Sequence, residues 1–376
     1  MAGKIAWEKS QPHAGREEAP GRAARILVTG GAGYIGSHTA KLLAHAGFEP
    51  VVFDNLSAGH PSAVKWGPLV RGDLEDSELV RSALAEYHIQ AVIHFAASAY
   101  VGESIRNPRK YFRNNVVNSL NLLNALTDAG IKHIVFSSTC SVYGMAATVP
   151  IPEHHPQDPV NPYGESKRFV ERALHWHSEA YGLRWIALRY FNAAGADHEG
   201  EIGEQHDPET HLIPLAMQAA SGSGRRLEVY GMDYPTPDGT AIRDYIHVTD
   251  LAEAHVRALT YLLDGGRCTA LNLGTGTGHS VREVISQVER TCKQKIDTHE
   301  APRRPGDPPV LIADPTRACA LLDWRPRYSA LDALIETAWR WQQLRNGGRH
   351  VPQEPLAEPQ AVKPDWQTRA DGFPKA

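Results

Sequence analysis

The chain has 376 residues, 42% of them hydrophobic and 22% charged, which is the composition of an ordinary soluble globular protein. It carries 39 Lys and Arg against 43 Asp and Glu, and the net charge of −4 argues against a general nucleic-acid-binding protein. The sequence shows no apolar run long enough to span a membrane and no pattern of a secretory signal. Its four cysteines include no Cys-x-x-Cys pair. We therefore expect a reducing, cytoplasmic setting.

Short apolar runs alternate with helical patterns from residue 25 to residue 191. The runs expected to form strands are Ile26–Val28, Val51–Phe53, Leu69–Val70, Ala91–Phe95, Ile134–Phe136 and Trp185–Leu188. Helical spacing of apolar residues lies between them, at His38–Ala46, Ser77–Tyr87 and Val116–Ala129. This alternation predicts an α/β fold with a doubly wound, Rossmann-like parallel sheet.

The regular alternation of apolar runs and helical patterns ends at residue 191. Residues 192–243 are rich in Gly, Pro and Asp, and a helix at Thr249–Leu263 and a strand at Ala270–Leu273 follow. We expect a second, smaller α/β lobe that interleaves with the first. The predicted organisation is a flexible arm at 1–24, a sheet domain at 25–191 with a returning segment near 244–275, the smaller lobe at 192–243 and 276–347, and a disordered tail at 348–376.

A glycine-rich turn follows the first predicted strand. Gly30, Gly33 and Gly36 stand between that strand and a helix, which is the setting in which backbone N–H groups can approach a pyrophosphate. Asp54 ends the next strand, 18 residues after Gly36, and its carboxylate can accept hydrogen bonds from an adenosine ribose. A 2′-phosphate would meet like charge there, so NAD is favoured over NADP. Asp73 ends the third strand and could meet the adenine edge.

A second motif carries the chemistry. Asn161 and Pro162 suit the N-cap and first position of a helix, which places Tyr163 in its first turn. Lys167, four residues later, shares the same helix face. Its ammonium is expected to lower the pKa of the phenol, so that Tyr163 can remove a proton from a sugar hydroxyl. Thr139, at the end of the preceding strand, can present its hydroxyl to the same substrate oxygen.

Other reactive residues receive structural interpretations. Cys140 has no partner base with a positional argument, so packing is its expected role. The late glycine cluster at 272–278 has no acidic partner downstream and is interpreted as a structural turn. Neither His154 with His155 nor His206 with His211 has the spacing of a metal motif, so we expect loop roles and no metal.

These motifs together resemble a known family. The glycine loop at 29–37, the strand end at 137–139 and the Tyr163-x-x-x-Lys167 pair are similar to those of the extended short-chain dehydrogenases/reductases. Further stretches resemble, within that group, the UDP-glucose 4-epimerases: 95–104, 189–196, 231–240, 242–247 and 303–307. The resemblance runs from about Arg25 to about Gln342.

The resemblance implies a tightly bound NAD in the sheet domain and a UDP-sugar in the smaller lobe. The implied cofactor-binding residues are Gly30, Gly33, Tyr34, Ile35, Gly36, Asp54, Asn55, Leu56, Ser57, Gly59, Asp73, Leu74, Phe95, Ala96, Ala97, Ala99, Asn114, Lys167 and Phe191. The implied substrate-binding residues are Thr139, Tyr163, Asn192, His211, Leu212, Tyr230, Arg243, Arg304 and Asp307. His211 stands where some members use Asn, and Leu311 stands where the side chain tunes acceptance of N-acetylated sugars. Charge agrees for Arg243 and Arg304, which could hold a diphosphate.

The implied activity is the interconversion of UDP-glucose and UDP-galactose through a transient 4-keto sugar, with catalytic roles for Tyr163, Lys167 and Thr139. Activity on UDP-xylose and UDP-arabinose remains an alternative, because some of these stretches also resemble pentose-acting members. Dehydratase or decarboxylase chemistry is disfavoured because no carboxylate follows Thr139. An NADP-dependent reductase is disfavoured because Asp54 would repel a 2′-phosphate. A non-catalytic NAD-binding regulator is disfavoured because both Tyr163 and Lys167 are present. The family also implies a homodimer through helices near 105–128 and 162–180.

Overall fold

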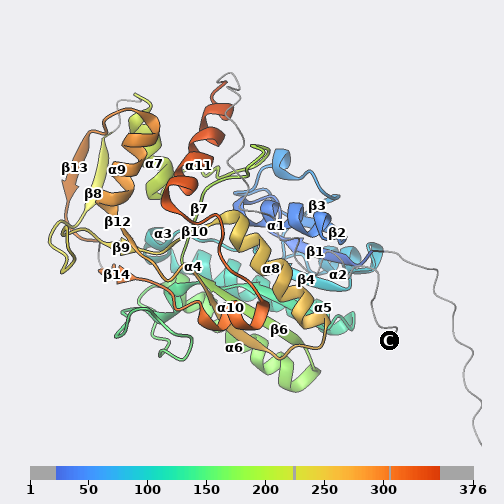
Figure 1. Cartoon of the computed structure of the whole chain (residues 1–376). Coiled ribbons are helices and arrows are strands. Elements are labelled where there is room, and N and C mark those ends of the chain that lie inside the picture. Colours follow the sequence, from blue (N-terminus) through green and yellow to red (C-terminus); the bar gives the residue numbers. More distant parts are fainter. Residues whose placement is uncertain (1–22, 223–225, 305, 348–376) are drawn as a thin grey trace, which may run out of the picture.

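The structure of the chain, a computed structural model, describes residues 23–222, 226–304 and 306–347 (Figure 1). All but two residues of the predicted arm at 1–24, and the whole predicted tail at 348–376, therefore lie outside the described residues. None of the helices within the described ranges combines the length and apolarity needed to cross a membrane.

A seven-stranded, fully parallel sheet is the centre of the fold, in the order β11-β6-β5-β4-β1-β2-β3. Its strands are β1 (Arg25–Thr29), β2 (Glu49–Asp54), β3 (Leu69–Arg71), β4 (Ala91–His94), β5 (His133–Ser137), β6 (Arg184–Tyr190) and β11 (Thr269–Leu273). Strand order reverses between β1 and β4, the point at which a doubly wound sheet opens a ligand crevice at its carboxyl edge. The predicted Rossmann-like sheet is confirmed.

Helices cover both faces of this sheet because successive strand side chains point to opposite sides. Ile26 and Val28 pack with α1 (Tyr34–His45), α8 (Val248–Leu263) and α10 (Thr316–Leu322). The intervening Leu27 packs with the other layer. That layer consists of α2 (Ser77–Glu86), α5 (Asn118–Asp128) and α6 (Pro162–Tyr181).

A smaller lobe lies at the upper left of Figure 1 and has its own apolar core. Its helices are α7 (Leu212–Ala220), α9 (Val281–Cys292) and α11 (Leu331–Arg345). Its short strands are β8 (Leu227–Tyr230) with β13 (Thr298–Ala301), and β9 (Ile242–Arg243) between β12 (His279–Ser280) and β14 (Val310–Leu311). A separate pair, β7 (Asn192–Ala194) and β10 (Tyr245–His247), lies beside the sheet domain. The proposed boundaries between the two lobes stay a prediction.

Several elements differ from the expectation. The first helix begins at Tyr34 rather than His38, because the glycine turn leads directly into it. The helix expected from residue 116 is preceded by α3 (Val101–Arg106), α4 (Pro108–Tyr111) and a π-helical segment at Phe112–Val117. The loop-rich stretch contains α7, which the sequence concealed because Pro214 stands inside it. Proline is tolerated there because it lies in the first turn, where no helical partner for its N–H exists.

Candidate active site

The catalytic candidates lie along one face of α6. The Asn161 side chain accepts a hydrogen bond from the Gly164 N–H (2.9 Å) and caps the helix, with proline at its first position, as predicted. Tyr163, Lys167 and a further acid, Glu171, then follow at intervals of four residues and share a face. The helix packs against the 3₁₀ turn at Cys140–Tyr143, and Lys167 reaches the carboxyl end of β5.

Tyr163 has a different electrostatic environment from the one predicted. Burial raises its pKa, and Tyr190, Cys140 and Tyr111 add to the increase, whereas a hydrogen bond with Thr139 lowers it. The expectation that Lys167 acidifies Tyr163 is therefore wrong for the chain by itself, because desolvation outweighs the favourable contacts. The predicted proximity of Tyr163 and Thr139 is present.

Lys167 is held rigidly beneath the site. Its Nζ donates a hydrogen bond to the Ser137 carbonyl oxygen (2.8 Å) and lies 4.9 Å from the centre of the Phe136 ring. Burial lowers its pKa to about 7, an effect that Glu171 opposes. Burial thus disfavours the ammonium form of Lys167, and Glu171 favours it.

A buried ion pair behind the catalytic face was not singled out from the sequence. Arg189, on β6, donates to both Glu171 oxygens (2.9 and 2.5 Å), and both side chains are about 95% buried. Ser138 donates to Glu171 as well, and Arg189 also donates to the Tyr143 hydroxyl. The pair fixes the strand end that carries Thr139. Its members are 18 residues apart, and the packing of α6 against β6 brings them together.

The glycine turn has the close backbone packing that its motif predicts. Gly30 has φ +71°, and a Cβ there would lie 2.6 Å from the Ala96 backbone nitrogen. A Cβ on Gly36 would lie 2.2 Å from the Gly30 carbonyl oxygen. Gly33 is the N-cap of α1 and has no side chain to occupy the free N–H groups of the first turn. The residues present therefore fit a pyrophosphate on this helix terminus.

Asp54 and Asp73 lie at neighbouring strand ends, as predicted. Asp54 accepts hydrogen bonds from the backbone N–H groups of Ala32 (3.0 Å) and Leu56 (2.8 Å), and burial raises its pKa. Asp73 accepts from the Asn55 side chain (2.7 Å). These bonds connect the glycine turn to the strand ends and leave further lone pairs for a ribose or an adenine.

A hollow of about 370 Å³ lies beside these acids. It is lined by Leu56, Ser57, Ala58, Gly59, His60, Pro61, Arg71 and Asp207. Leu56, Ser57 and Gly59 were predicted cofactor residues, whereas Arg71 and Asp207 come from distant segments that no local motif marks. Asp54 is paired in register with Arg71, so the sheet explains the position of Arg71, whereas Asp207 comes from the segment between β7 and α7.

The remaining cofactor candidates vary in exposure. Tyr34 is buried, and its hydroxyl donates to the Gly195 carbonyl oxygen (2.6 Å), whereas Leu74 packs in the core below α2 and offers only its backbone. The residues that are at least partly exposed are Ile35, Asn55, Phe95, Ala96, Ala97, Ala99 and Asn114. Phe191 is 7% exposed and packs with Cys140 and Leu311.

The charged substrate candidates form two pairs in the smaller lobe. Arg243 donates to the Asp307 carboxylate (2.5 Å), and the Arg304 guanidinium lies 4.0 Å from the centre of the Tyr230 ring. The Asp307 N–H also bonds to the Arg304 carbonyl oxygen (3.2 Å), so both pairs meet at one loop.

The other substrate candidates lie on neighbouring elements. Leu311 stands opposite Arg243 in the β14–β9 register. Asn192 begins β7. His211 precedes Leu212 at the start of α7 and contacts Glu204.

The alternative reactive groups have structural surroundings. Burial raises the pKa of the Cys140 thiol to about 12, which keeps it protonated. Asp244 accepts hydrogen bonds from the N–H groups of Thr275 and Gly276, so the late glycine cluster is a turn fastened by a buried acid. Both outcomes agree with the predicted roles.

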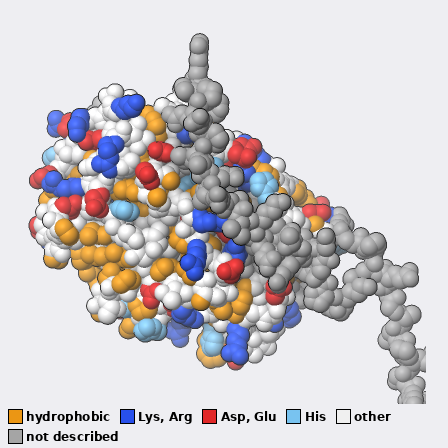
Figure 2. Space-filling view, viewed as in Figure 1, with side chains coloured by type: hydrophobic (Ala, Val, Ile, Leu, Met, Phe, Trp, Pro, Cys, Tyr) orange, Lys and Arg blue, Asp and Glu red, His pale blue; other side chains and the backbone are white. Residues whose placement is uncertain are grey.

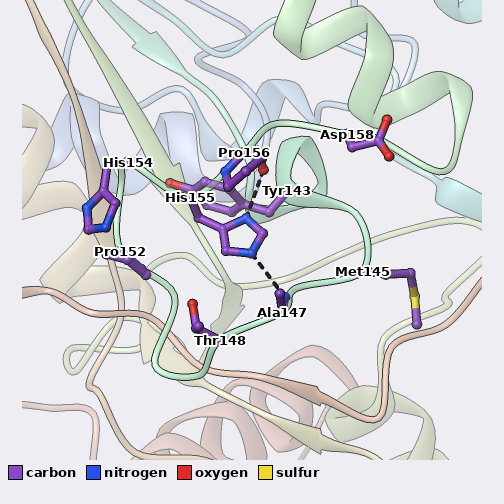
Figure 3. A pocket seen from close by; sticks show the side chains of 9 residues that line it. All are labelled: Tyr143, Met145, Ala147, Thr148, Pro152, His154, His155, Pro156 and Asp158. Carbon is purple, nitrogen blue, oxygen red and sulfur yellow. Dashed lines mark hydrogen bonds between the residues drawn. The ribbon is translucent and has the colours of Figure 1, made fainter.

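His155 connects two parts of its loop. Its Nε2 accepts from the Ala147 N–H (3.0 Å), and its Nδ1 bonds to the Pro156 carbonyl oxygen (2.8 Å) (Figure 3). The ring lies beside a surface pocket of about 440 Å³ in which none of the predicted cofactor or substrate residues takes part. A loop role for His155 is thus confirmed.

Comparison with known proteins agrees with this geometry. The model of the NAD dependent epimerase/dehydratase family matches residues 26–274. The chain is 52% identical over 323 residues to the UDP-glucose 4-epimerase of Rhizobium meliloti (strain 1021), a match that covers 86% of this chain and 98% of that protein.

Two solved structures are similar along nearly their whole length. UDP-glucose 4-epimerase from Brucella ovis in complex with NAD is 54% identical, with a TM-score of 0.83 over 84% of this chain and 98% of that one. The UDP-glucose 4-epimerase from Stenotrophomonas maltophila with bound NAD and formylated UDP-arabinopyranose is 39% identical, with a TM-score of 0.83 over 87% and 99%. This chain belongs to the NAD-dependent epimerase/dehydratase family.

Proposed function

We propose that this chain is an NAD-dependent UDP-glucose 4-epimerase, an isomerase that interconverts UDP-glucose and UDP-galactose. The observation that carries the proposal is the α6 face, where Tyr163 lies beside Thr139 and stands one turn from Lys167. This face lies at the carboxyl edge of the same sheet that carries the glycine turn. The relatives described above, at 52% and 54% identity, support the same activity.

NAD would be held by the glycine turn, Asp54, Asp73 and the adjacent hollow. The close approach of Gly36 to Gly30 and the free N–H groups of α1 fit its pyrophosphate, and Asp54 fits its ribose. When bound, oxidised NAD supplies a reversible hydride acceptor for C4 and a positive charge in the site.

The protein side of the mechanism is proton transfer at O4. Thr139 holds O4 by a hydrogen bond while Tyr163 removes its proton as the C4–H bond breaks. The resulting keto sugar turns in the pocket, and Tyr163 returns the proton after hydride has been restored to the other face of C4. Because burial raises the pKa of Tyr163 and Thr139 lowers it, the phenolate would depend on Thr139 and on the positive charge that bound oxidised NAD would introduce.

Two arginines of the smaller lobe would hold the diphosphate of UDP. Arg243 and Arg304 meet at the 304–307 loop, and both are already oriented, by Asp307 and Tyr230. A firm grip on the nucleotide leaves the hexose free to turn, which inversion at C4 requires. Leu311, opposite Arg243, is an apolar boundary that would favour sugars without an N-acetyl group.

A homodimer would cover an apolar surface formed by α6 and its neighbours. The exposed large side chains there are Ile105, Phe112, Val117, Phe169 and Trp176. Phe169 and Trp176 stand two turns apart on α6, which contacts α3, α4 and α5. Elsewhere, on the face in Figure 2, acidic and basic side chains are interspersed, which gives no support to a nucleic-acid surface.

One assay tests the activity and the substrate. Purified protein is incubated, without added NAD, with UDP-glucose, UDP-galactose, UDP-xylose or UDP-N-acetylglucosamine. We expect equilibration of UDP-glucose and UDP-galactose. Equilibration of the pentose pair alone would replace the proposed substrate, and no turnover even with added NAD would favour a non-catalytic NAD-binding protein.

A further inference from the structure

The segment between β7 and α7 brings four potential metal ligands to one point. One ligand atom from each of Glu204, His206, Glu209 and His211 lies within 4.8 Å of all the others. His206 Nδ1 lies 3.1 Å from Glu204 Oε1 and 3.9 Å from Glu209 Oε1. His211 Nδ1 contacts the same Glu204 oxygen.

We propose that these side chains bind a divalent transition-metal ion of the Zn²⁺ or Mn²⁺ type through two imidazole nitrogens and two carboxylate oxygens. Ligand atoms about 2.1 Å from one tetrahedral ion are separated by about 3.4 Å, and two of the separations, 3.1 and 3.9 Å, lie on either side of this value. His211 Nδ1 and Glu204 Oε1 are closer than this and would move apart to admit the ion. Imidazole ligands favour such ions over Mg²⁺ and Ca²⁺, which prefer oxygen alone. The irregular spacing explains why the sequence predicted no metal.

The charge of the cluster requires compensation. The side chains of Glu204 and Glu209 are only 8% and 7% exposed. Within the described part of the chain, neither forms an ion pair with Lys or Arg, and their cationic partners are the two histidines. The centres of the two imidazole rings are 5.2 Å apart. A divalent ion between them would balance the two carboxylate charges from one centre.

The surrounding residues orient the proposed ligands and leave the site accessible to an ion from solvent. Glu209 Oε1 accepts a hydrogen bond from the His211 backbone N–H (2.9 Å), which fixes that carboxylate. The His206 ring packs edge-on near Tyr34 and Tyr100, with centres 6.3 and 6.0 Å apart. The His211 side chain is 48% exposed and provides access from solvent.

The ion would hold the 204–211 segment across the predicted cofactor hollow. Asp207, within this segment, lines the hollow, and the Gln205 carbonyl oxygen bonds to His60 on its other wall (3.1 Å). The binding function is therefore structural: it connects the start of the smaller lobe to the sheet domain.

A neighbouring cluster provides a matched control. Asp197, Glu199 and Glu201 also converge, but the Lys41 ammonium already occupies their centre, 2.9 Å from Asp197 and 2.8 Å from Glu201. This cluster has its cation built in and should bind no metal. Removal of one carboxylate by Glu199→Gln should thus leave metal binding unchanged.

The test is metal titration of the full-length protein after chelator dialysis at pH 8. Calorimetry with Zn²⁺ and electron paramagnetic resonance with Mn²⁺ should both show one saturable site per chain, and Mg²⁺ should not compete. Glu204→Gln and His206→Asn should weaken binding at least about tenfold. His211→Asn changes an exposed ligand, so it should fold and weaken binding even if the buried variants do not fold.

Two results would overturn the proposal. One is the absence of saturable Zn²⁺ and Mn²⁺ binding to the wild-type chain, which would leave protons on both histidines as the compensating charge. The other is a result in which His211→Asn binds metal as tightly as the wild type, and in which Glu204→Gln or His206→Asn folds and also binds metal as tightly as the wild type. Neither calorimetry nor electron paramagnetic resonance measures epimerase activity, so failure of the metal-site proposal can be distinguished from failure of the proposed function.

Discussion

The two ends of the proposed site hold their charged groups in different ways. At the catalytic end, Lys167, Glu171 and Arg189 are buried and their hydrogen bonds go to fixed backbone or to one another. At the nucleotide end, Arg243 is paired with the partly exposed Asp307, and the exposed Arg304 lies on Tyr230. We infer that the first end keeps one geometry for proton transfer, whereas the second can exchange its internal partners for a diphosphate.

Replacement of the phenol tests the catalytic end most directly. Tyr163→Phe removes the proton acceptor without removing the ring, so kcat should fall about 10³-fold. The glycine turn and Asp54 are untouched, so NAD released on denaturation should match wild type. Full activity in the variant would refute the assignment of Tyr163.

The buried ion pair should control stability rather than chemistry. Glu171→Gln leaves the Arg189 charge without its full partner, and we expect a loss of about 3 kcal/mol in the free energy of unfolding. The matched control is Glu165→Gln, since Glu165 forms a partly exposed pair with Arg168 on the same helix (3.7 Å) and its loss should cost less than about 0.5 kcal/mol. Urea unfolding measures both, and equal losses would contradict the role of burial.

Prediction from sequence succeeded where chemistry is local in the chain. The glycine turn, the acids at strand ends and the Asn161-capped helix each depend on residues a few positions apart, and each lies where expected. The Glu171–Arg189 pair depends on the packing of α6 against β6, and the cluster at 204–211 depends on an irregular loop, so no spacing rule marks either of them. The predicted acidification of Tyr163 was wrong because it counted a nearby charge but not the cost of burial.

A buried imidazole below the catalytic end should make stability depend on pH. His94 bonds to the hydroxyls of Thr29 (2.6 Å) and Ser119 (2.8 Å), and burial lowers its pKa to about 3. The unfolded chain therefore binds more protons than the folded chain below pH 6.5, and stability falls as the pH decreases. At pH 5 this amounts to about 2 kcal/mol.

Denaturant unfolding at pH 7.5 and pH 5 checks the contribution of His94. His94→Gln should reduce the difference between the two stabilities by about that amount, whereas the same substitution at the exposed His175 should leave the difference as in wild type. An unchanged difference in His94→Gln would show that His94 is not the group responsible.

The nucleotide end should respond in binding rather than in turnover. Arg243→Gln removes one charged partner of the diphosphate, and we expect KM for UDP-glucose to rise about tenfold while kcat changes less than about twofold. Arg226→Gln is the control, because Arg226 forms an exposed pair with Asp297 (2.7 Å) outside the proposed site and should leave both constants unchanged. A fall in kcat with constant KM would place Arg243 with the catalytic groups instead. The two ends would then not divide binding and chemistry as their burial indicates.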